Sequence, residues 1–208
     1  MTGSGDQGDD AEARDRVWLA AVARGDRASF ERMYLHHHGR LARFLARHST
    51  QRDVVDEIIN ETFWIVWRSA QTFRGDSKIS TWIIGIAWRC LLKSLRNQPR
   101  AASQAELDAH ERADGSFADA DAADSERREL RDWVNGGLAL LPPDQRATIE
   151  LAYFLGQSCE EIATIMDCAV GTVKARLFHA RVRLRNTLPA LGGETAASAL
   201  SVGSHARE

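Results

Sequence analysis

The sequence lacks the patterns that mark several large protein classes. Its 208 residues include only three cysteines, Cys90, Cys159 and Cys168, and so sparse and odd a set does not suggest a secreted disulfide scaffold. No apolar run approaches the roughly 20 residues that span a bilayer. The N-terminus is polar and acidic, which is not typical of a signal peptide. We therefore expect a cytoplasmic protein without membrane insertion.

Signals for strands and for catalysis are scarce as well. No sustained alternation of β-branched residues appears, whereas apolar residues recur every three or four positions over long stretches. This periodicity predicts an all-α protein. The sequence contains no Ser/His/Asp set, Walker loop or glycine-rich phosphate motif, so we expect neither an enzyme nor a cofactor.

Changes in composition predict two small helical domains, at residues 12–98 and 126–189. Residues 1–11 and 190–208 are small and polar, which is typical of disordered tails. Residues 99–125 are rich in Ala, Asp and Ser, which predicts a flexible acidic linker. The net charge of −2 hides basic stretches on both sides of this linker.

Local signals predict several helix ends. Gly25 breaks a first helix, and Asp26 can cap the next one. Ser80 or Thr81 opens a strongly apolar helix that ends near Asn97. A later helix over 126–141 carries the pair Gly136-Gly137, which weakens its middle.

The clearest motif is a helix-turn-helix at residues 158–187. Ser158 and Glu161 have the spacing of a capping box, and residues 167–170 form the turn. The following helix has apolar residues spaced by 4, 3, 4 and 4 positions: Val173, Leu177, Ala180, Leu184 and Leu188. Its other face is basic, as in a recognition helix that reads duplex DNA, although a solvated basic face is the alternative.

Two further segments carry functional signals. Single-strand capture uses aromatic and basic side chains, and residues 73–93 supply both types: Phe73, Arg74, Lys78, Trp82, Trp88, Arg89 and Lys93. Core packing is the favoured alternative for Trp82 and an equal one for Trp88. A helix near residues 53–69 has a polar face that is either solvated or a protein contact: Asp53, Asp56, Glu57, Asn60 and Glu61.

These motifs together resemble the extracytoplasmic-function (ECF) sigma factors of bacterial RNA polymerase. DVVDEIINETFWIVWR resembles the family's core-polymerase-binding helix, and FRGDSKISTWIIGIAWR resembles its promoter-melting loop and helix. LPPDQRATIELAYFLG and SCEEIATIMDCAVGTVKARLFHARVRLRNTL resemble its C-terminal domain. The resemblance covers most of residues 15–188, with the segments in the family's order.

The resemblance implies an alternative sigma factor that starts transcription of a specific, stress-responsive regulon. The first domain would dock on the clamp helices of the polymerase largest subunit and capture the minus-ten element. The second would read the minus-thirty-five element and touch the flap of the second-largest subunit. The acidic linker would mimic nucleic acid inside a basic channel. An anti-sigma factor is a further partner at the level of family expectation.

The resemblance also assigns residues to each contact. At the minus-thirty-five element it implies Thr172, Lys174, Ala175, Arg176, Phe178, His179, Arg181 and Arg183. At the minus-ten element and in melting it implies Phe73, Arg74, Asp76, Ser77, Lys78, Trp88, Arg89 and Lys93. On core polymerase it implies Asp53, Asp56, Glu57, Asn60, Glu61 and Trp67. Many relatives have Ser at the place of Ala175, Arg at that of His179, and a small apolar residue followed by Asn at Trp88-Arg89, so we expect altered promoter preferences.

Three other interpretations are weaker. A stand-alone helix-turn-helix regulator would need a sensor domain with a pocket, whereas the first domain offers an acidic helix and an aromatic, basic loop. His36, His37 and His38 point about 100° apart on a helix and cannot all bind one ion, so we expect no metal site. Cys159 and Cys168 are more typical of small apolar residues than of a redox switch.

Overall fold

The computed structural model describes residues 4–49, 51–97 and 122–191, and these residues form helices without strands. Contacts between helices divide the chain into two compact units. The first holds α1 (Ser4–Val22), α2 (Arg27–Leu45), α3 (Arg52–Ser69), η1 (Ala70–Thr72), α4 (Ile79–Asn97) and nearly all of α8 (Cys159–Met166). The second holds α6 (Ala122–Ala139), α7 (Pro143–Tyr153) and α9 (Val170–Leu191). The all-α prediction is confirmed for the described residues.

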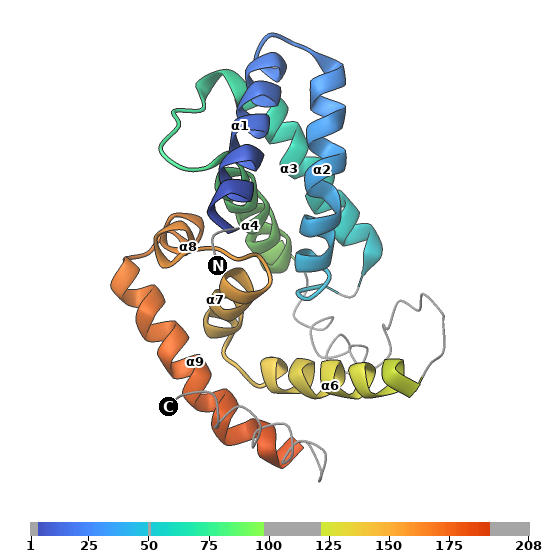
Figure 1. The fold of residues 1–208 in the computed structure, drawn as a ribbon, viewed down its shortest axis with the longest axis vertical. Coiled ribbons are helices and arrows are strands. Elements are labelled where there is room, and N and C mark those ends of the chain that lie inside the picture. The colour runs from blue at the N-terminus through green and yellow to red at the C-terminus, as the bar shows by residue number, and fades with distance from the viewer. Residues whose placement is uncertain (1–3, 50, 98–121, 192–208) are drawn as a thin grey trace. The chain divides into compact units, whose positions relative to one another are not determined.

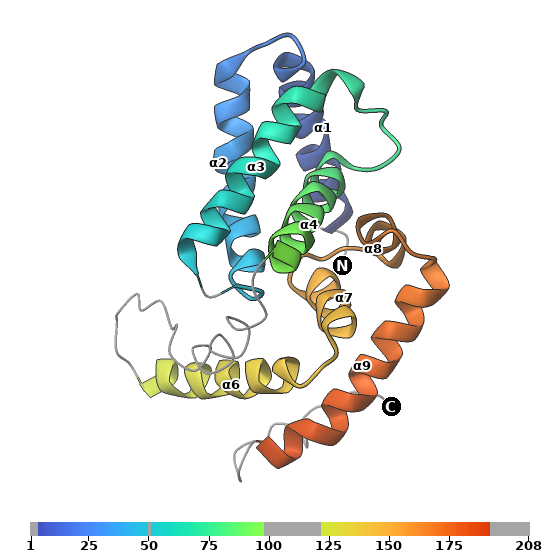
Figure 2. The same ribbon diagram turned by 180° about the vertical axis from the view of Figure 1, so that it is seen from behind.

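In the first unit, α1 packs on α2 and α4, and α3 packs on α2 and α4 (Figures 1 and 2). The fully buried side chains that these four helices share are large and apolar, and include Met33, Leu41, Phe44, Phe63 and Ile83. Burial of one such side chain stabilises a fold by about 1.5–3 kcal/mol. This shared core keeps α3 and α4, the helices of two predicted sites, in fixed positions relative to each other.

The turn between α1 and α2 confirms the predicted break and cap. Gly25 has a φ of +88°, a left-handed conformation that glycine adopts without steric cost. The Asp26 carboxylate accepts hydrogen bonds from the amides of Ala28 at 3.3 Å and Ser29 at 3.2 Å. The Ser29 side chain and these amides lower the pKa of Asp26, because they favour the charged carboxylate.

A long-range cap at the start of α4 was not foreseen. The Glu12 carboxylate of α1 accepts a hydrogen bond from the Ile79 amide, with its two oxygens 3.1 and 3.4 Å from the nitrogen. α4 therefore begins at Ile79, before the predicted Ser80 or Thr81. A carboxylate suits this position because the first amides of a helix lack partners and carry partial positive charge.

In the second unit, α6 and α7 both pack on α9. The Trp133 indole donates a hydrogen bond of 2.7 Å to the Leu188 carbonyl. A Cβ atom on Gly137 would lie 2.5 Å from Leu188 Cδ2, so the absence of a side chain permits the close approach of α6 and α9. Gly137, predicted to weaken its helix, thus has a packing role.

Several predicted boundaries differ from the structure. α1 begins at Ser4, so residues 4–11 are helical rather than part of a disordered tail. Extending an existing helix is favourable because each added residue gains a hydrogen bond, and no proline interrupts this segment. α6 begins at Ala122, four residues before the predicted 126. Most of the predicted linker and tail, residues 99–121 and 192–208, lies outside the described residues.

The elements of the predicted helix-turn-helix are present. α8 and α9 flank a short turn in which Asp167 has a φ of 51°. The contacts group α8 with the first unit, although residues 126–189 were predicted as one domain. The domain boundaries therefore stay a prediction.

Candidate nucleic-acid and polymerase-binding sites

The face of α9 predicted to read DNA is exposed. Val173, Leu177 and Ala180 are buried, whereas the predicted base-proximal residues of the same helix are exposed: Lys174, Ala175, Phe178 and His179. The Phe178 ring is 62% exposed and so is accessible to a partner. Arg181, Arg183 and Thr172 are exposed too, and Arg176 is half-buried. The predicted division of α9 into an apolar and a basic face is confirmed.

Two arginines of this face contact side chains of α7. Arg176 forms an ion pair with Asp144. Arg181 donates a hydrogen bond from Nε to the Tyr153 hydroxyl at 3.1 Å, and its guanidinium lies 5.8 Å from the tyrosine ring centre. Neither Asp144 nor Tyr153 was predicted as a functional residue, because the contact between α7 and α9 depends on tertiary packing. α7 therefore sets where these two cations lie on the α9 face.

The predicted polymerase-binding face of α3 is polar and accessible. Asp53, Asp56, Glu57 and Asn60 are exposed. Glu61 is half-buried and accepts a hydrogen bond of 2.8 Å from the Lys93 ammonium of α4. This contact raises the pKa of Lys93 because the carboxylate favours the charged ammonium. A predicted polymerase contact and a predicted DNA contact are thus joined by an ion pair.

The two tryptophans near the end of α3 have different environments. Trp67, a predicted polymerase contact, is half-buried, with its ring 5.1 Å from that of Phe30. Trp64 is 60% exposed, and the Arg68 guanidinium lies 6.0 Å from its ring centre. Trp64 was not predicted as a contact, although it follows Asn60 by four positions and Glu57 by seven, spacings that place it on the polar face.

The predicted minus-ten residues lie in the loop after η1 and along α4. The exposed members of this set are Arg74, Asp76, Lys78, Arg89 and Lys93, while Phe73 and Ser77 are half-buried. The rings of Phe73 and Trp82 lie 4.9 Å apart. Trp82 is half-buried rather than fully in the core. The loop thus presents cations beside an aromatic pair.

Trp88 requires a correction. Its side chain is only 7% exposed, and its ring lies 5.9 Å from that of His48 and 6.4 Å from that of Phe44. A tryptophan this deeply packed offers almost no surface for stacking on a base, so the structure assigns it to the core and not to direct DNA contact. The neighbouring Arg89 is exposed, because the next position on a helix points about 100° away.

Comparisons with known proteins identify the same two regions. Residues 33–101 match the family model "Sigma-70 region 2", and residues 133–184 match "Sigma-70, region 4". The ECF RNA polymerase sigma-E factor of Escherichia coli K12 is 33% identical over 183 residues, which cover 85% of this chain and 95% of that protein. The Haemophilus influenzae protein of the same name is 32% identical, with 85% and 96% covered.

The chain belongs to the ECF family of RNA polymerase sigma factors. The resemblance read from the sequence is thereby confirmed, and the stand-alone regulator is disfavoured. As a member of this family, the chain is a transcription initiation factor whose partners are core RNA polymerase and promoter DNA.

Solved structures support the fold of this ECF sigma factor. CnrH, in complex with the cytosolic domain of CnrY, has a TM-score of 0.63 at 24% identity, covering 85% of this chain and 98% of CnrH. RpoE of Bartonella quintana, in complex with the anti-sigma factor NepR, has a TM-score of 0.55 at 24% identity, covering 77% and 96%. Among the described residues, no helix has the length and apolar character needed to cross a membrane.

Proposed function

We propose that this sigma factor directs core RNA polymerase to a specific set of promoters, with α9 at the minus-thirty-five element. The observation that carries this proposal is the exposed basic face of α9, which lies opposite the buried side chains of Val173, Leu177 and Ala180. A helix in the major groove needs such a face, because cations neutralise phosphates while neighbouring side chains contact base edges. Lys174, Ala175, Phe178 and His179 contact bases in this proposal, and Thr172, Arg176, Arg181 and Arg183 lie nearer phosphates.

The loop after η1 and the exposed side of α4 bind the minus-ten strand in this proposal. Arg74, Lys78 and Arg89 are exposed cations within one short segment. Single-stranded DNA binds where positive charge follows the backbone and aromatic rings stack on bases. Phe73 and Trp82 form the aromatic pair closest in sequence to these cations. Trp88 acts here only through the core packing that holds α4.

The polar face of α3 docks on the clamp helices of the largest polymerase subunit in this proposal, and the α9 domain touches the flap. Asp53, Asp56, Glu57 and Asn60 form that face, and the exposed ring of Trp64 extends it. Aromatic residues often provide much of the binding energy at protein interfaces, within a polar rim. In this proposal Trp67 stabilises the face by packing its ring against that of Phe30.

We further propose that the protein acts in the cytoplasm, has no enzymatic activity of its own, and serves a stress-responsive regulon under the control of an anti-sigma factor. Two relatives of the same fold, CnrH and RpoE of Bartonella quintana, were solved in complex with CnrY and with NepR. An inhibitor that covers the α3 face or the α9 face would block polymerase or promoter binding.

A run-off transcription assay tests the central proposal. Core polymerase and this protein are combined with a promoter found by mapping transcription starts after overexpression. We expect transcripts only when both proteins are present, and strongly reduced transcripts for Arg181→Ala at low protein concentration. Specific duplex binding without any association with core polymerase would contradict the proposal.

A double variant tests polymerase binding by α3 separately from promoter binding by α9. Asp56→Arg with Glu57→Arg reverses two charges on an exposed face, so we expect weak core binding while promoter binding by α9 persists. Normal core affinity in this variant would refute the docking assignment of α3. The reverse pattern is expected of Arg181→Ala, which should bind core normally.

A further inference from the structure

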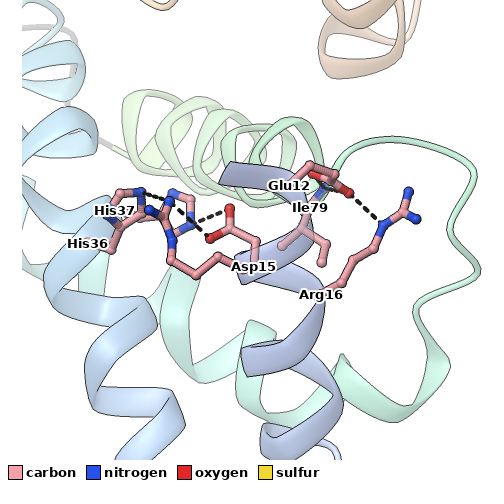
Figure 3. A network of polar contacts seen from close by, with 7 residues as sticks. Glu12, Asp15, Arg16, His36, His37 and Ile79 are labelled. Atoms are coloured by element: carbon pink, nitrogen blue, oxygen red, sulfur yellow. Dashed lines mark hydrogen bonds and ion pairs between the residues drawn. The ribbon is translucent and has the colours of Figure 1, made fainter. Parts of the chain in front are cut away.

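A cluster of metal-binding side chains joins α1 and α2, and it includes none of the residues predicted to contact promoter DNA or polymerase. One ligand atom each from Asp15, His36 and His37 lies within 4.8 Å of the other two. Figure 3 shows the Asp15 carboxylate of α1 pointing toward the two histidines of α2. The contact between Asp15 and these histidines could not be predicted from the sequence, because it depends on how α1 packs on α2.

Two members of the cluster are deeply buried and already close. Asp15 Oδ2 lies 3.1 Å from His37 Nε2, and the two side chains are only 4% and 8% exposed. Ligand atoms that share a tetrahedral Zn²⁺ at bonds of about 2.1 Å lie about 3.4 Å apart. Asp15 and His37 are therefore nearly at the spacing that a common ion requires.

The second carboxylate oxygen of this pair has no hydrogen bond. Asp15 Oδ1 is buried, and its nearest cation, the Arg14 guanidinium, lies 3.8 Å away. A buried carboxylate oxygen without a hydrogen bond is costly, since nearly all buried polar atoms in proteins have partners. A bound cation would supply what this oxygen lacks.

His36 completes the donor set from the solvent side. Its side chain is exposed, and its Nε2 atom is 2.7 Å from a terminal nitrogen of Arg14. An arginine can only donate, so this nitrogen of His36 carries the lone pair that a metal needs.

We propose that Asp15, His36 and His37 bind a divalent transition-metal ion of the Zn²⁺ type, with water as the fourth ligand. Carboxylate and imidazole are common Zn²⁺ ligands, and three protein ligands with one water form a recognised coordination. Binding draws the exposed His36 ring toward the buried pair and displaces the Arg14 guanidinium. The three consecutive histidines do not all bind the ion in this proposal. His38 takes no part, and its ring lies 5.2 Å from that of Tyr34.

The ion would link α1 to α2, far along the chain from the predicted DNA contacts. Because only the folded first unit brings Asp15 to the histidines, metal binding stabilises that unit by mass action. The inference is independent of the proposed promoter contacts.

Metal titration of the full chain, freed of metal by a chelator, tests the inference. Co²⁺ serves as the spectroscopic probe and Zn²⁺ as its competitor. We expect one Co²⁺ per chain with a visible d–d absorption band that Zn²⁺ abolishes, and a rise in Tm of about 4 °C or more at saturating Zn²⁺. No band, or an unchanged Tm with Zn²⁺, would overturn the proposal.

Variants distinguish this site from casual binding by surface histidines. Asp15→Asn and His36→Gln each remove one ligand, so we expect affinity to fall at least about tenfold. Arg14→Gln removes a competing cation and should bind Co²⁺ more tightly than the unaltered protein. His38→Gln is the matched control and should bind normally. Equal losses for His36→Gln and His38→Gln, or no loss for Asp15→Asn, would show adventitious binding.

A variant at the exposed His36 keeps the proposal testable even if variants of the buried Asp15 fold poorly. If Asp15→Asn lowers the Tm of the metal-free chain, His36→Gln still removes a ligand, and it does so at an exposed position. Unchanged Co²⁺ affinity in a folded His36→Gln protein would then refute the proposed ligand set.

Discussion

The Arg181 guanidinium of α9 is held by the Tyr153 hydroxyl of α7, with the Nε–O distance at 3.1 Å. Both side chains are exposed, so the contact lies on the surface that the proposed function turns toward DNA. An arginine has five N–H donors, and this contact uses one of them. Tyr153 can therefore orient Arg181 and leave donors for a phosphate.

Tyr153→Phe should weaken promoter binding by about two- to fivefold, because it removes a hydrogen bond of about 0.5–1 kcal/mol and keeps the ring. Fluorescence anisotropy with a duplex of the minus-thirty-five region measures the change. The control makes the same substitution in the Arg181→Ala protein, where we expect no further loss of promoter affinity. An equal loss in both backgrounds would show that Tyr153 acts without Arg181.

Asp144→Asn should strengthen promoter binding several-fold. The Asp144 carboxylate pairs with Arg176, so it competes with phosphates for that guanidinium and repels them. We expect the slope of log K against log salt to become steeper by about 1, while Arg176→Ala should make it shallower. Anisotropy titrations at several salt concentrations give both slopes. Unchanged slopes in both variants would remove Arg176 from the phosphate contacts.

Trp64→Ala should reduce affinity for core polymerase by about tenfold or more, as expected for an exposed aromatic anchor at an interface. The ring is 60% exposed, so the Tm of the free protein should change little. Trp67→Ala is the matched comparison, because that ring packs on Phe30 and its loss should lower the Tm. Competition with a labelled sigma factor for core measures affinity. Normal core binding by Trp64→Ala would exclude Trp64 from the interface.

Adjacent glycines of α6 should respond oppositely to alanine. A Cβ at Gly136 would meet only Leu191 Cδ1 at 3.9 Å, so Gly136→Ala should stabilise the helix by about 0.5–1 kcal/mol. A Cβ at Gly137 would lie 2.5 Å from Leu188 Cδ2, so Gly137→Ala should lower the free energy of unfolding by about 1–3 kcal/mol relative to the unaltered protein. Urea unfolding followed by circular dichroism measures both. Equal stabilities would contradict the close approach of α6 and α9.

Cys90 should react with a thiol reagent much more slowly than Cys159 and Cys168. Burial raises the pKa of the Cys90 thiol, so less of the reactive thiolate is present near pH 8. A disulfide-exchange dye should show two faster thiols and one slow thiol in the native protein, and three fast thiols in denaturant. In Cys90→Ala the slow phase should vanish; its persistence would mean that another cysteine is the protected one.

Local signals predicted much of the fold because they depend on neighbours in the chain. The cap by Asp26 and the apolar stripe of Val173, Leu177 and Ala180 follow from residues a few positions apart. The Glu12 cap on Ile79 joins residues 67 positions apart, so no local pattern contains it. The start of α4 was misplaced for this reason.

Residue type and position on a helix gave conflicting signals at the candidate sites. Trp67 and Trp88 were chosen for their chemistry, but packing against Phe30, Phe44 and His48 decides their exposure. Trp64 was missed although helical spacing from Glu57 places it on the polar face. Pairs such as Asp144 with Arg176, and Asp15 with His37, require the packing of whole helices and cannot be read from spacing.

The last turns of α9 also serve the helix that follows the linker region. Leu188 receives the Trp133 indole hydrogen bond and fills the space that Gly137 leaves open. A chain shortened to end at Arg185 would keep all the residues assigned to base and phosphate contact but lose this attachment. We therefore expect such a truncation to weaken the packing of α6 on α9 while the DNA-reading face of α9 stays intact. The Tm would then fall while the affinity for DNA stays the same.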